Sequence, residues 1–107
     1  MALVKTSELE GIALDWAVAA CWGYKPKEAV ALVATGRYSP TVKWLQCGVI
    51  IESEGIQLNV SEDKKEWTAS SWGYKDTQKA NSPLVAAMRC YVAIKLGDKV
   101  NIPEEFV

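Results

Sequence analysis

The sequence predicts a small α+β domain, and three observations lead to that class. A chain of 107 residues is long enough for one domain and too short for two independent cores. Half of its residues are apolar, far more than a disordered chain carries. Apolar residues recur at helical spacing near both ends and alternate with period two near the middle. We therefore expect one domain over residues 1–107, with an N-terminal helix, a short antiparallel sheet and a buried C-terminal helix.

The first helix is expected at about residues 8–22. Ser7 and Glu10 have the spacing of a capping box, in which two side chains satisfy unpaired backbone donors at a helix start. Apolar residues then recur at helical spacing through an Ala-rich stretch. Gly23 follows the last of them, where a left-handed residue ends a helix.

The next segment has two interpretations. Pro26 could open a short helix, whereas Ala29–Ala34 also has the character of a buried strand, and we favour the strand. Residues 35–40 have the composition of a loop. Residues 42–54 are consistent with a short helix that Gly48 interrupts.

The middle of the chain predicts a hairpin. Residues 56–60 alternate apolar and polar side chains, and a polar turn leads from them into residues 66–70. From Ser71 to Ala80 we expect a loop, because Gly, Ser, Lys and Asp are frequent there. Trp72 and Tyr74 are expected to be exposed on this loop as a contact for a partner.

The last helix is the clearest element. Ser82 is a good N-cap, Pro83 suits the first helical position, and residues 84–96 are apolar almost all round. Gly97 follows as a terminator, and residues 98–103 could give a short strand. We expect this helix to be the buried centre of the fold.

The composition excludes several classes of function. Twelve Lys and Arg stand against thirteen Asp and Glu, so the basic excess needed for bulk binding to nucleic acid is missing. The chain has no His, and its three Cys form neither a disulfide framework nor a zinc knuckle. We therefore expect neither an enzyme nor a metal or cofactor site. Without a signal peptide or an apolar run of about 18 residues, we expect a soluble cytoplasmic protein that enters no membrane.

Several side chains suggest a site for a nucleotide-like small molecule. Tyr38, Trp44 and Trp67 would stack on a base, and the amide of Gln46 would read its edge. Arg89 interrupts an apolar helix, so it either neutralises a ligand phosphate, pairs internally with Glu52 or Asp15, or extends its stem to solvent. The residues expected to bind the ligand are Tyr38, Ser39, Trp44, Gln46, Glu52, Trp67 and Arg89.

Ordered segments along nearly the whole chain carry a family resemblance: KTSEL at 5–9, ALDWAVA at 13–19, YSP at 38–40, Trp44, Gln46 and Gly48, IIE at 50–52, WTA at 67–69, PLVAAMRCYVA at 83–93 and KLGD at 95–98. The sequence resembles the NinX-like proteins of tailed phages and prophages, which are small accessory proteins. It departs from their pattern at Cys47 and Val49, where the family has Gly and Pro, and over residues 25–37. The resemblance implies a phage origin and an accessory role in the cytoplasm of the infected bacterium, and it supplies no catalytic residue.

Two hypotheses of function follow. In the first, the protein forms a homo-oligomer that binds and sequesters a small nucleotide-like molecule, of the kind that bacterial immune systems use as signals. This hypothesis rests on analogy with small phage proteins that blunt bacterial defence by binding. In the second, the protein inhibits or redirects a host or phage protein through the loop that carries Trp72 and Tyr74, without a small-molecule ligand.

Overall fold

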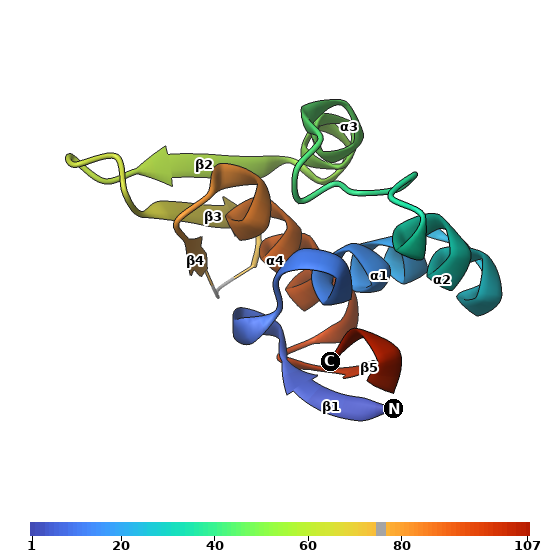
Figure 1. Ribbon diagram of the computed structural model, residues 1–107. Helices are drawn as coiled ribbons and strands as arrows, with labels where there is room; N and C mark the ends of the chain where they lie inside the picture. The colour runs from blue at the N-terminus through green and yellow to red at the C-terminus, as the bar shows by residue number, and fades with distance from the viewer. Residues whose placement is uncertain (75–76) are drawn as a thin grey trace.

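Four α-helices, five strands and two short 3-10 helices make up residues 1–74 and 77–107, the part of the chain that the computed structural model describes (Figure 1). The fold class is α+β, as predicted. None of the helices in this part of the chain combines the length and the apolar character that a membrane span requires. In chain order the elements are β1 (Ala2–Lys5), η1 (Thr6–Glu8), α1 (Gly11–Trp22), α2 (Pro26–Ala34), α3 (Trp44–Glu54), β2 (Ile56–Val60), β3 (Trp67–Ser71), β4 (Gln78–Ala80), α4 (Pro83–Leu96), β5 (Lys99–Ile102) and η2 (Glu104–Phe106).

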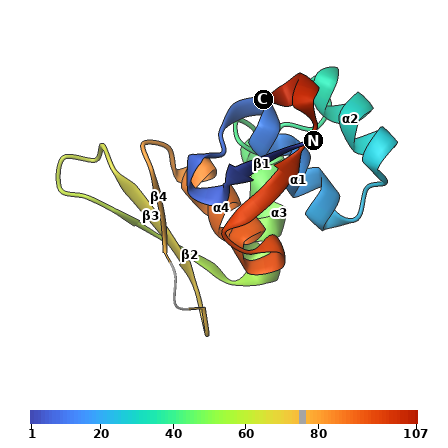
Figure 2. The same ribbon diagram turned by 90° about the horizontal axis from the view of Figure 1, so that it is seen from below.

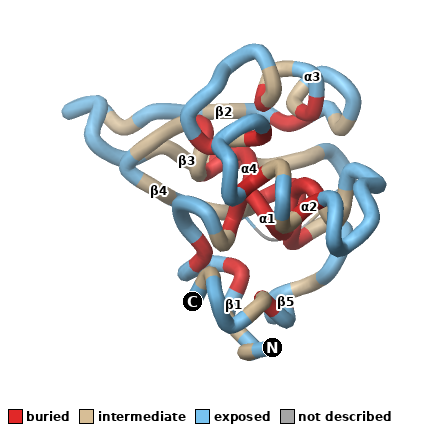
Figure 3. Tube along the Cα trace, turned by 45° about the vertical axis from the view of Figure 1, so that its right-hand side comes forward, coloured by how far each residue is buried: buried red, intermediate tan, exposed pale blue. Residues whose placement is uncertain are grey.

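Helix α4 is the central element, as the sequence predicts. It contacts the sheet of β2, β3 and β4 as well as α1 and α3, and eight of its fourteen residues are buried (Figure 3). The Ser82 hydroxyl accepts a hydrogen bond from the Val85 backbone N–H at 3.4 Å, and Pro83 occupies the first turn. Gly97 ends the helix with a φ of 89°, a conformation that favours glycine. The predicted caps at both ends are therefore confirmed.

The hairpin of β2 and β3 is also confirmed, and a third strand extends it. Ile56 pairs with Ser71 and Val60 with Trp67 in antiparallel register. β4 then pairs with β3, so the loop predicted up to Ala80 is wrong for residues 78–80. Residues 75–76 of that loop lie outside the described part of the chain.

The two aromatic residues of this loop differ in their exposure. Trp72 is 93% exposed, as predicted. Tyr74 is only half-buried, and its hydroxyl donates a hydrogen bond to the Ala93 carbonyl of α4 at 2.7 Å. The expectation of an exposed Tyr74 is therefore wrong, because the phenol hydroxyl finds an acceptor on the neighbouring helix.

A second sheet joins the two ends of the chain. β1 and the predicted strand β5 are antiparallel, with Ala2 opposite Ile102 and Lys5 opposite Lys99. Thr6 is buried just beyond them, and its hydroxyl donates to the Gly97 carbonyl at 2.6 Å. Figures 1 and 2 show this small sheet on one side of α4 and the β2–β3 hairpin extending away on another.

The predicted start of the first helix is wrong by about one turn. Ser7 lies in η1, and α1 begins at Gly11 with Glu10 as its N-cap, so no capping box forms. The cause is β1, which η1 links to α1 and which the sequence did not predict. The predicted end is confirmed, because Gly23 adopts the left-handed conformation with a φ of 114°.

The strand favoured at residues 29–34 is a helix, α2. Pro26 opens it, and only Ala29 and Val33, four residues apart, are buried, which is the pattern of a helix lying on α1. α3 also differs from its prediction, because it runs unbroken through Gly48.

Candidate functional site

Three of the predicted site residues lie together between α2 and α3. The Gln46 amide oxygen accepts from the Ser39 backbone N–H at 2.7 Å, and its amide nitrogen donates to the Arg37 carbonyl at 2.8 Å. Tyr38 is buried and lies edge-on to Tyr24, with 5.4 Å between ring centroids. Burial and the neighbouring Tyr24 raise the pKa of the Tyr38 hydroxyl above its ordinary value. Gln46 thus holds the loop before α3, and both ends of its amide are occupied by backbone.

Trp44 and Glu52 lie on the same helix and face solvent. Trp44 is the first residue of α3 and is 56% exposed. Glu52 is exposed two turns later. Trp44 is therefore close in sequence to the Gln46 cluster and accessible to a ligand or a partner.

Arg89 holds two backbone segments together. Its Nε donates to the Leu9 carbonyl at 2.7 Å, and its Nη1 donates to the Lys79 carbonyl at 2.8 Å. Neither Glu52 nor Asp15, its expected internal partners, is bonded to it. Desolvation lowers the pKa of the guanidinium and the charge of Glu10 opposes that shift, so the group remains a cation.

Two other residues lie away from the Gln46 cluster: Trp67, which was predicted to stack on a ligand, and Asp15, which was considered as a partner of Arg89. Trp67 begins β3, is half-buried, and pairs with Val60 on one side and Ala80 on the other. Asp15 is a buried carboxylate on α1 that accepts from the Thr41 backbone N–H at 3.0 Å. Desolvation raises the pKa of Asp15, although its hydrogen bonds with Thr41 and the charge of Lys43 oppose the shift. The seven predicted residues are thus spread over the loop before α3, the α3 helix, β3 and α4.

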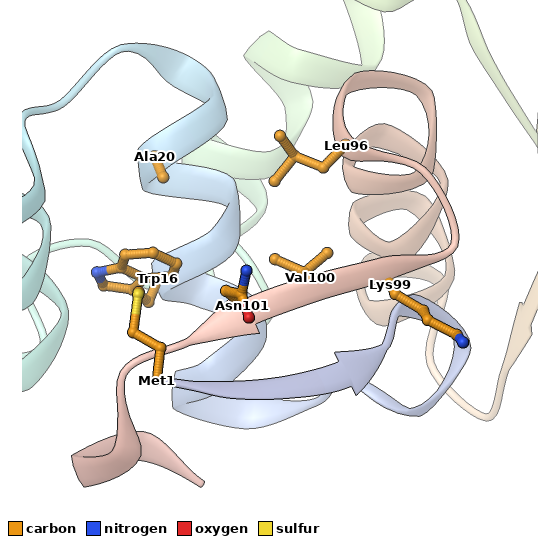
Figure 4. A pocket seen from close by; sticks show the side chains of 7 residues that line it. All are labelled: Met1, Trp16, Ala20, Leu96, Lys99, Val100 and Asn101. Carbon is orange, nitrogen blue, oxygen red and sulfur yellow. The ribbon is translucent and has the colours of Figure 1, made fainter.

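A groove of about 400 Å³ lies between α1, the end of α4 and β5 (Figure 4). This volume falls in the lower part of the range of small-molecule sites. Its lining is mostly apolar and includes none of the seven predicted residues. The lining residues are Met1, Trp16, Ala20, Leu96, Lys99, Val100 and Asn101.

Trp16 provides an aromatic wall and an unused donor. The residue is 6% exposed, and its indole N–H has no hydrogen-bond partner among the described residues. Figure 4 shows this nitrogen beside Met1, at the end of the ring that points away from Val100. A buried donor without a partner costs about 1–3 kcal/mol.

The polar rim of the groove comes from the outer face of the β1–β5 sheet. Lys99 and Asn101 are exposed at alternate positions of β5 and line the groove. Lys5 of β1 pairs directly with Lys99, so two like charges stand opposite each other on that face. Such a pair is destabilising by itself, and an anion between the two ammonium groups would relieve it. The lining of the groove therefore includes an indole, an amide and one lysine, and Lys5 lies beside Lys99 outside that lining.

Sequence reasoning missed this groove because it did not predict β1. Alternation of polar and apolar residues from Lys99 to Ile102 already marked one outward face of a strand. Only the pairing with β1 shows that Lys5, 94 positions away, shares this face. That pairing is a contact between the two ends of the chain, which short-range patterns do not report.

The potential metal ligands and the thiols are the remaining reactive groups of the described residues. No three His, Cys, Asp or Glu side chains within residues 1–74 and 77–107 cluster as a metal site would. Burial raises the pKa of Cys21 and Cys90 to about 11 and that of Cys47 to about 12. All three thiols are therefore protonated near neutral pH and are weak nucleophiles.

A family model described as Bacteriophage P22, NinX matches residues 5–95. The chain belongs to this family. The matched residues of this NinX-family protein include all seven residues singled out from the sequence, together with Trp16 and Ala20 of the groove. The match ends before β5, which carries Lys99 and Asn101. No curated protein matches the chain.

Proposed function

We propose that this NinX-family protein binds and sequesters a small nucleotide-like molecule in the groove between α1, α4 and β5. The observation that supports the proposal is the lining of that groove, an apolar floor with Trp16 at one end and Asn101 and Lys99 contributed by β5, although the Lys99 ammonium is directed away from Trp16 (Figure 4). An aromatic wall accommodates a planar base, an amide hydrogen-bonds to its edge, and an ammonium group attracts phosphate. In an infected bacterium, such a protein would lower the free concentration of an immune signal.

The proposed reaction is binding without turnover. Stacking of one base contributes about 1–3 kcal/mol. The raised pKa values of the three thiols offer no activated nucleophile. We expect a bound nucleotide to be recovered chemically unchanged.

Ligand binding in the groove can be tested by isothermal titration calorimetry with adenine and guanine mononucleotides and with cyclic dinucleotides. Lys99→Ala and Asn101→Ala change exposed side chains and should each weaken binding by about tenfold. Trp16→Phe keeps a smaller aromatic ring in the wall and removes the N–H donor together with part of the buried indole. Lys27→Ala, on the exposed side of α2, is the matched control for the loss of one cation. Equal affinities for all four variants and the wild type would place the ligand elsewhere.

The residues predicted from the sequence provide a second location for the same ligand. Trp44 is exposed beside the loop of Tyr38 and Ser39, whereas the polar groups of Gln46 and Arg89 are engaged with backbone. If Trp44→Ala abolishes nucleotide binding and the groove variants do not, the ligand lies at α3. The two locations are therefore distinguished by the same titration.

A second candidate function, capture of a host or phage protein, is favoured by Trp72. Its indole is 93% exposed on the turn after β3, and Tyr74 fixes that turn to α4 through the hydrogen bond to Ala93. A tryptophan held on an anchored turn is typical of interface hot spots. Trp72→Ala should abolish capture of the partner from infected cells and leave nucleotide binding unchanged. An undiminished capture would exclude this role for Trp72.

A further inference from the structure

Strand β2 presents a row of backbone groups at the edge of its sheet. The strand order β2–β3–β4 leaves β2 with a partner on one side. Just beyond the last pair of the β2–β3 ladder, the Ser61 N–H donates to the Glu66 carbonyl at 2.9 Å. Bonded and non-bonded pairs alternate along an antiparallel ladder. The N–H and C=O groups of Ile56, Leu58 and Val60 therefore point away from β3.

The two edges of this sheet differ in how they are covered. On β4 the same alternation turns the backbone of Lys79 outward, and its carbonyl accepts from Arg89 Nη1 at 2.8 Å. Over the residues that the structure describes, no hydrogen bond reaches the outward backbone groups of β2. Figures 1 and 2 show the β2–β3 hairpin extending away from the helices. The β4 edge is thus capped by a side chain, and the β2 edge is open.

The sequence of β2 does nothing to discourage pairing at this edge. Exposed edges are usually protected by lysine, proline or a very short strand. β4 has three residues and carries Lys79, and β1 ends in Lys5. β2 has five residues, IQLNV, without a charge or a proline. Such an edge is suited to accept another strand.

The side chains of β2 divide between two faces. Ile56 is 7% exposed and Leu58 is half-buried, on the face that α4 covers. Val60 shares their face at the far end of the strand and is 43% exposed. Gln57 and Asn59 are exposed on the opposite face. One face of the edge is therefore apolar and the other carries neutral amides.

We propose that a second copy of the same chain pairs with this edge, β2 against β2, antiparallel about a two-fold axis at Leu58. In this register Leu58 bonds to Leu58 of the other copy, and Ile56 bonds to Val60, so every outward N–H and C=O has a partner. An axis at Gln57 would leave Val60 without a strand partner, and an axis at Asn59 would leave Ile56 without one. The open backbone groups thus select one register.

The side chains match in that same register. Ile56 lies opposite Val60 of the other copy, which covers the exposed part of that valine with an apolar neighbour. Gln57 lies opposite Asn59 on the other face, where two amides can hydrogen-bond to each other. No like charges face each other across the pair. This complementarity of the strand with itself is the reason for assigning the edge to a second copy.

The pairing also closes the assembly. Two three-stranded sheets joined through β2 give one sheet of six strands, with β4 at both edges. Both of those edges are capped by Arg89, so no further copy can add. The interface uses no residue of the groove and does not involve Trp72, so it is independent of the proposed functions.

Sedimentation equilibrium of the full chain over a range of concentrations tests the proposal, and the wild type should be a dimer. Val60→Pro removes an N–H that points away from β3, a position where an edge strand tolerates proline. It deletes one interface hydrogen bond from each copy and should raise the dimer dissociation constant by about tenfold or more. Val60→Thr keeps both the N–H and the branched shape, and as the matched control it should change the constant by less than about threefold. Circular dichroism checks that each variant is folded.

The register is tested on the exposed face of β2. Gln57→Lys with Asn59→Lys places ammonium groups opposite each other across the interface and should weaken the dimer by about tenfold. Gln57→Lys with Asn59→Glu changes the same two positions but places opposite charges together, and should leave the dimer intact. Equal weakening by the two double variants would refute the register.

Two outcomes would overturn the proposal as a whole. One is a wild-type protein that stays monomeric at the highest attainable concentration, which would leave the edge to a strand from a different protein. The other is a dimer that is unchanged both by Val60→Pro and by the double lysine variant, because the interface would then lie elsewhere.

Discussion

Replacement of Arg89 by Met tests whether this residue stabilises the fold. The guanidinium joins the Leu9 carbonyl, 80 positions away, to the Lys79 carbonyl, ten positions away. It therefore links β4 and the segment between η1 and α1 to α4. Met keeps much of the apolar stem and removes both donors. The change therefore isolates the two hydrogen bonds.

The loss can be worked from these two bonds. A hydrogen bond from a charged donor contributes about 1.5–3 kcal/mol, so two fully shielded bonds would contribute about 3–6 kcal/mol. Arg89 is only half-buried and its bond to Lys79 is exposed, so water replaces part of what is lost. We expect the free energy of unfolding to fall by about 2–3 kcal/mol.

Urea denaturation monitored by circular dichroism measures this change. An unchanged dependence of the unfolding free energy on urea concentration would show that the unfolded state is the same. Arg37→Met, which removes an exposed arginine on the loop before α3, is the control and should change the stability by less than about 0.5 kcal/mol. A stable Arg89→Met protein that no longer retains nucleotide would refute the structural assignment. It would support instead the phosphate-binding role predicted from the sequence.

Three further substitutions test other contacts. Asp15→Asn keeps an acceptor for the Thr41 N–H and removes a desolvated charge; because burial raises the pKa of Asp15 above 3.8, the variant should be more stable than the wild type at neutral pH, and this gain should disappear below pH 3.8. A pH-independent difference between the two unfolding curves would contradict this. Gln46→Leu should cost about 1–2 kcal/mol and speed hydrogen exchange at the Ser39 amide; normal protection there would show that Gln46 does not hold the loop. Tyr74→Phe should lower the free energy of unfolding by about 1 kcal/mol and should reduce the change in Trp72 fluorescence on partner binding. Unchanged stability would argue against the bond to Ala93.

Local sequence signals are sufficient to predict a helix or strand when its own residues determine where it begins and ends. Ser82, Pro83 and Gly97 define both ends of α4, and alternation defines β2, so these elements were predicted correctly. Over residues 26–34 the same apolar run suits a buried strand or a helix, and the packing of Ala29 and Val33 on α1 decides for the helix. β1 was missed because its four residues are stabilised by pairing with β5 at the other end of the chain.

The candidate site was harder to predict than the fold. The sequence gives the residue types that suit a nucleotide, but hydrogen bonding decides which of them remain available. Gln46 and Arg89 were chosen for their donors, and both use those donors on backbone carbonyls. Trp16 was assigned only to a helix, although its N–H is the unsatisfied donor beside the groove. Neither the burial of a polar atom nor the identity of its partner can be read from spacing.

Native mass spectrometry of the protein purified from phage-infected, defence-active bacteria tests the central claim most directly. Gentle ionisation preserves a bound molecule, and denaturation then releases it for identification. A nucleotide-like mass retained by the wild type and by Lys27→Ala, but lost from the double variant Lys99→Ala/Asn101→Ala, is the predicted result. A wild-type protein that carries no small molecule, or a retained molecule that the double variant holds equally well, would contradict sequestration in the groove.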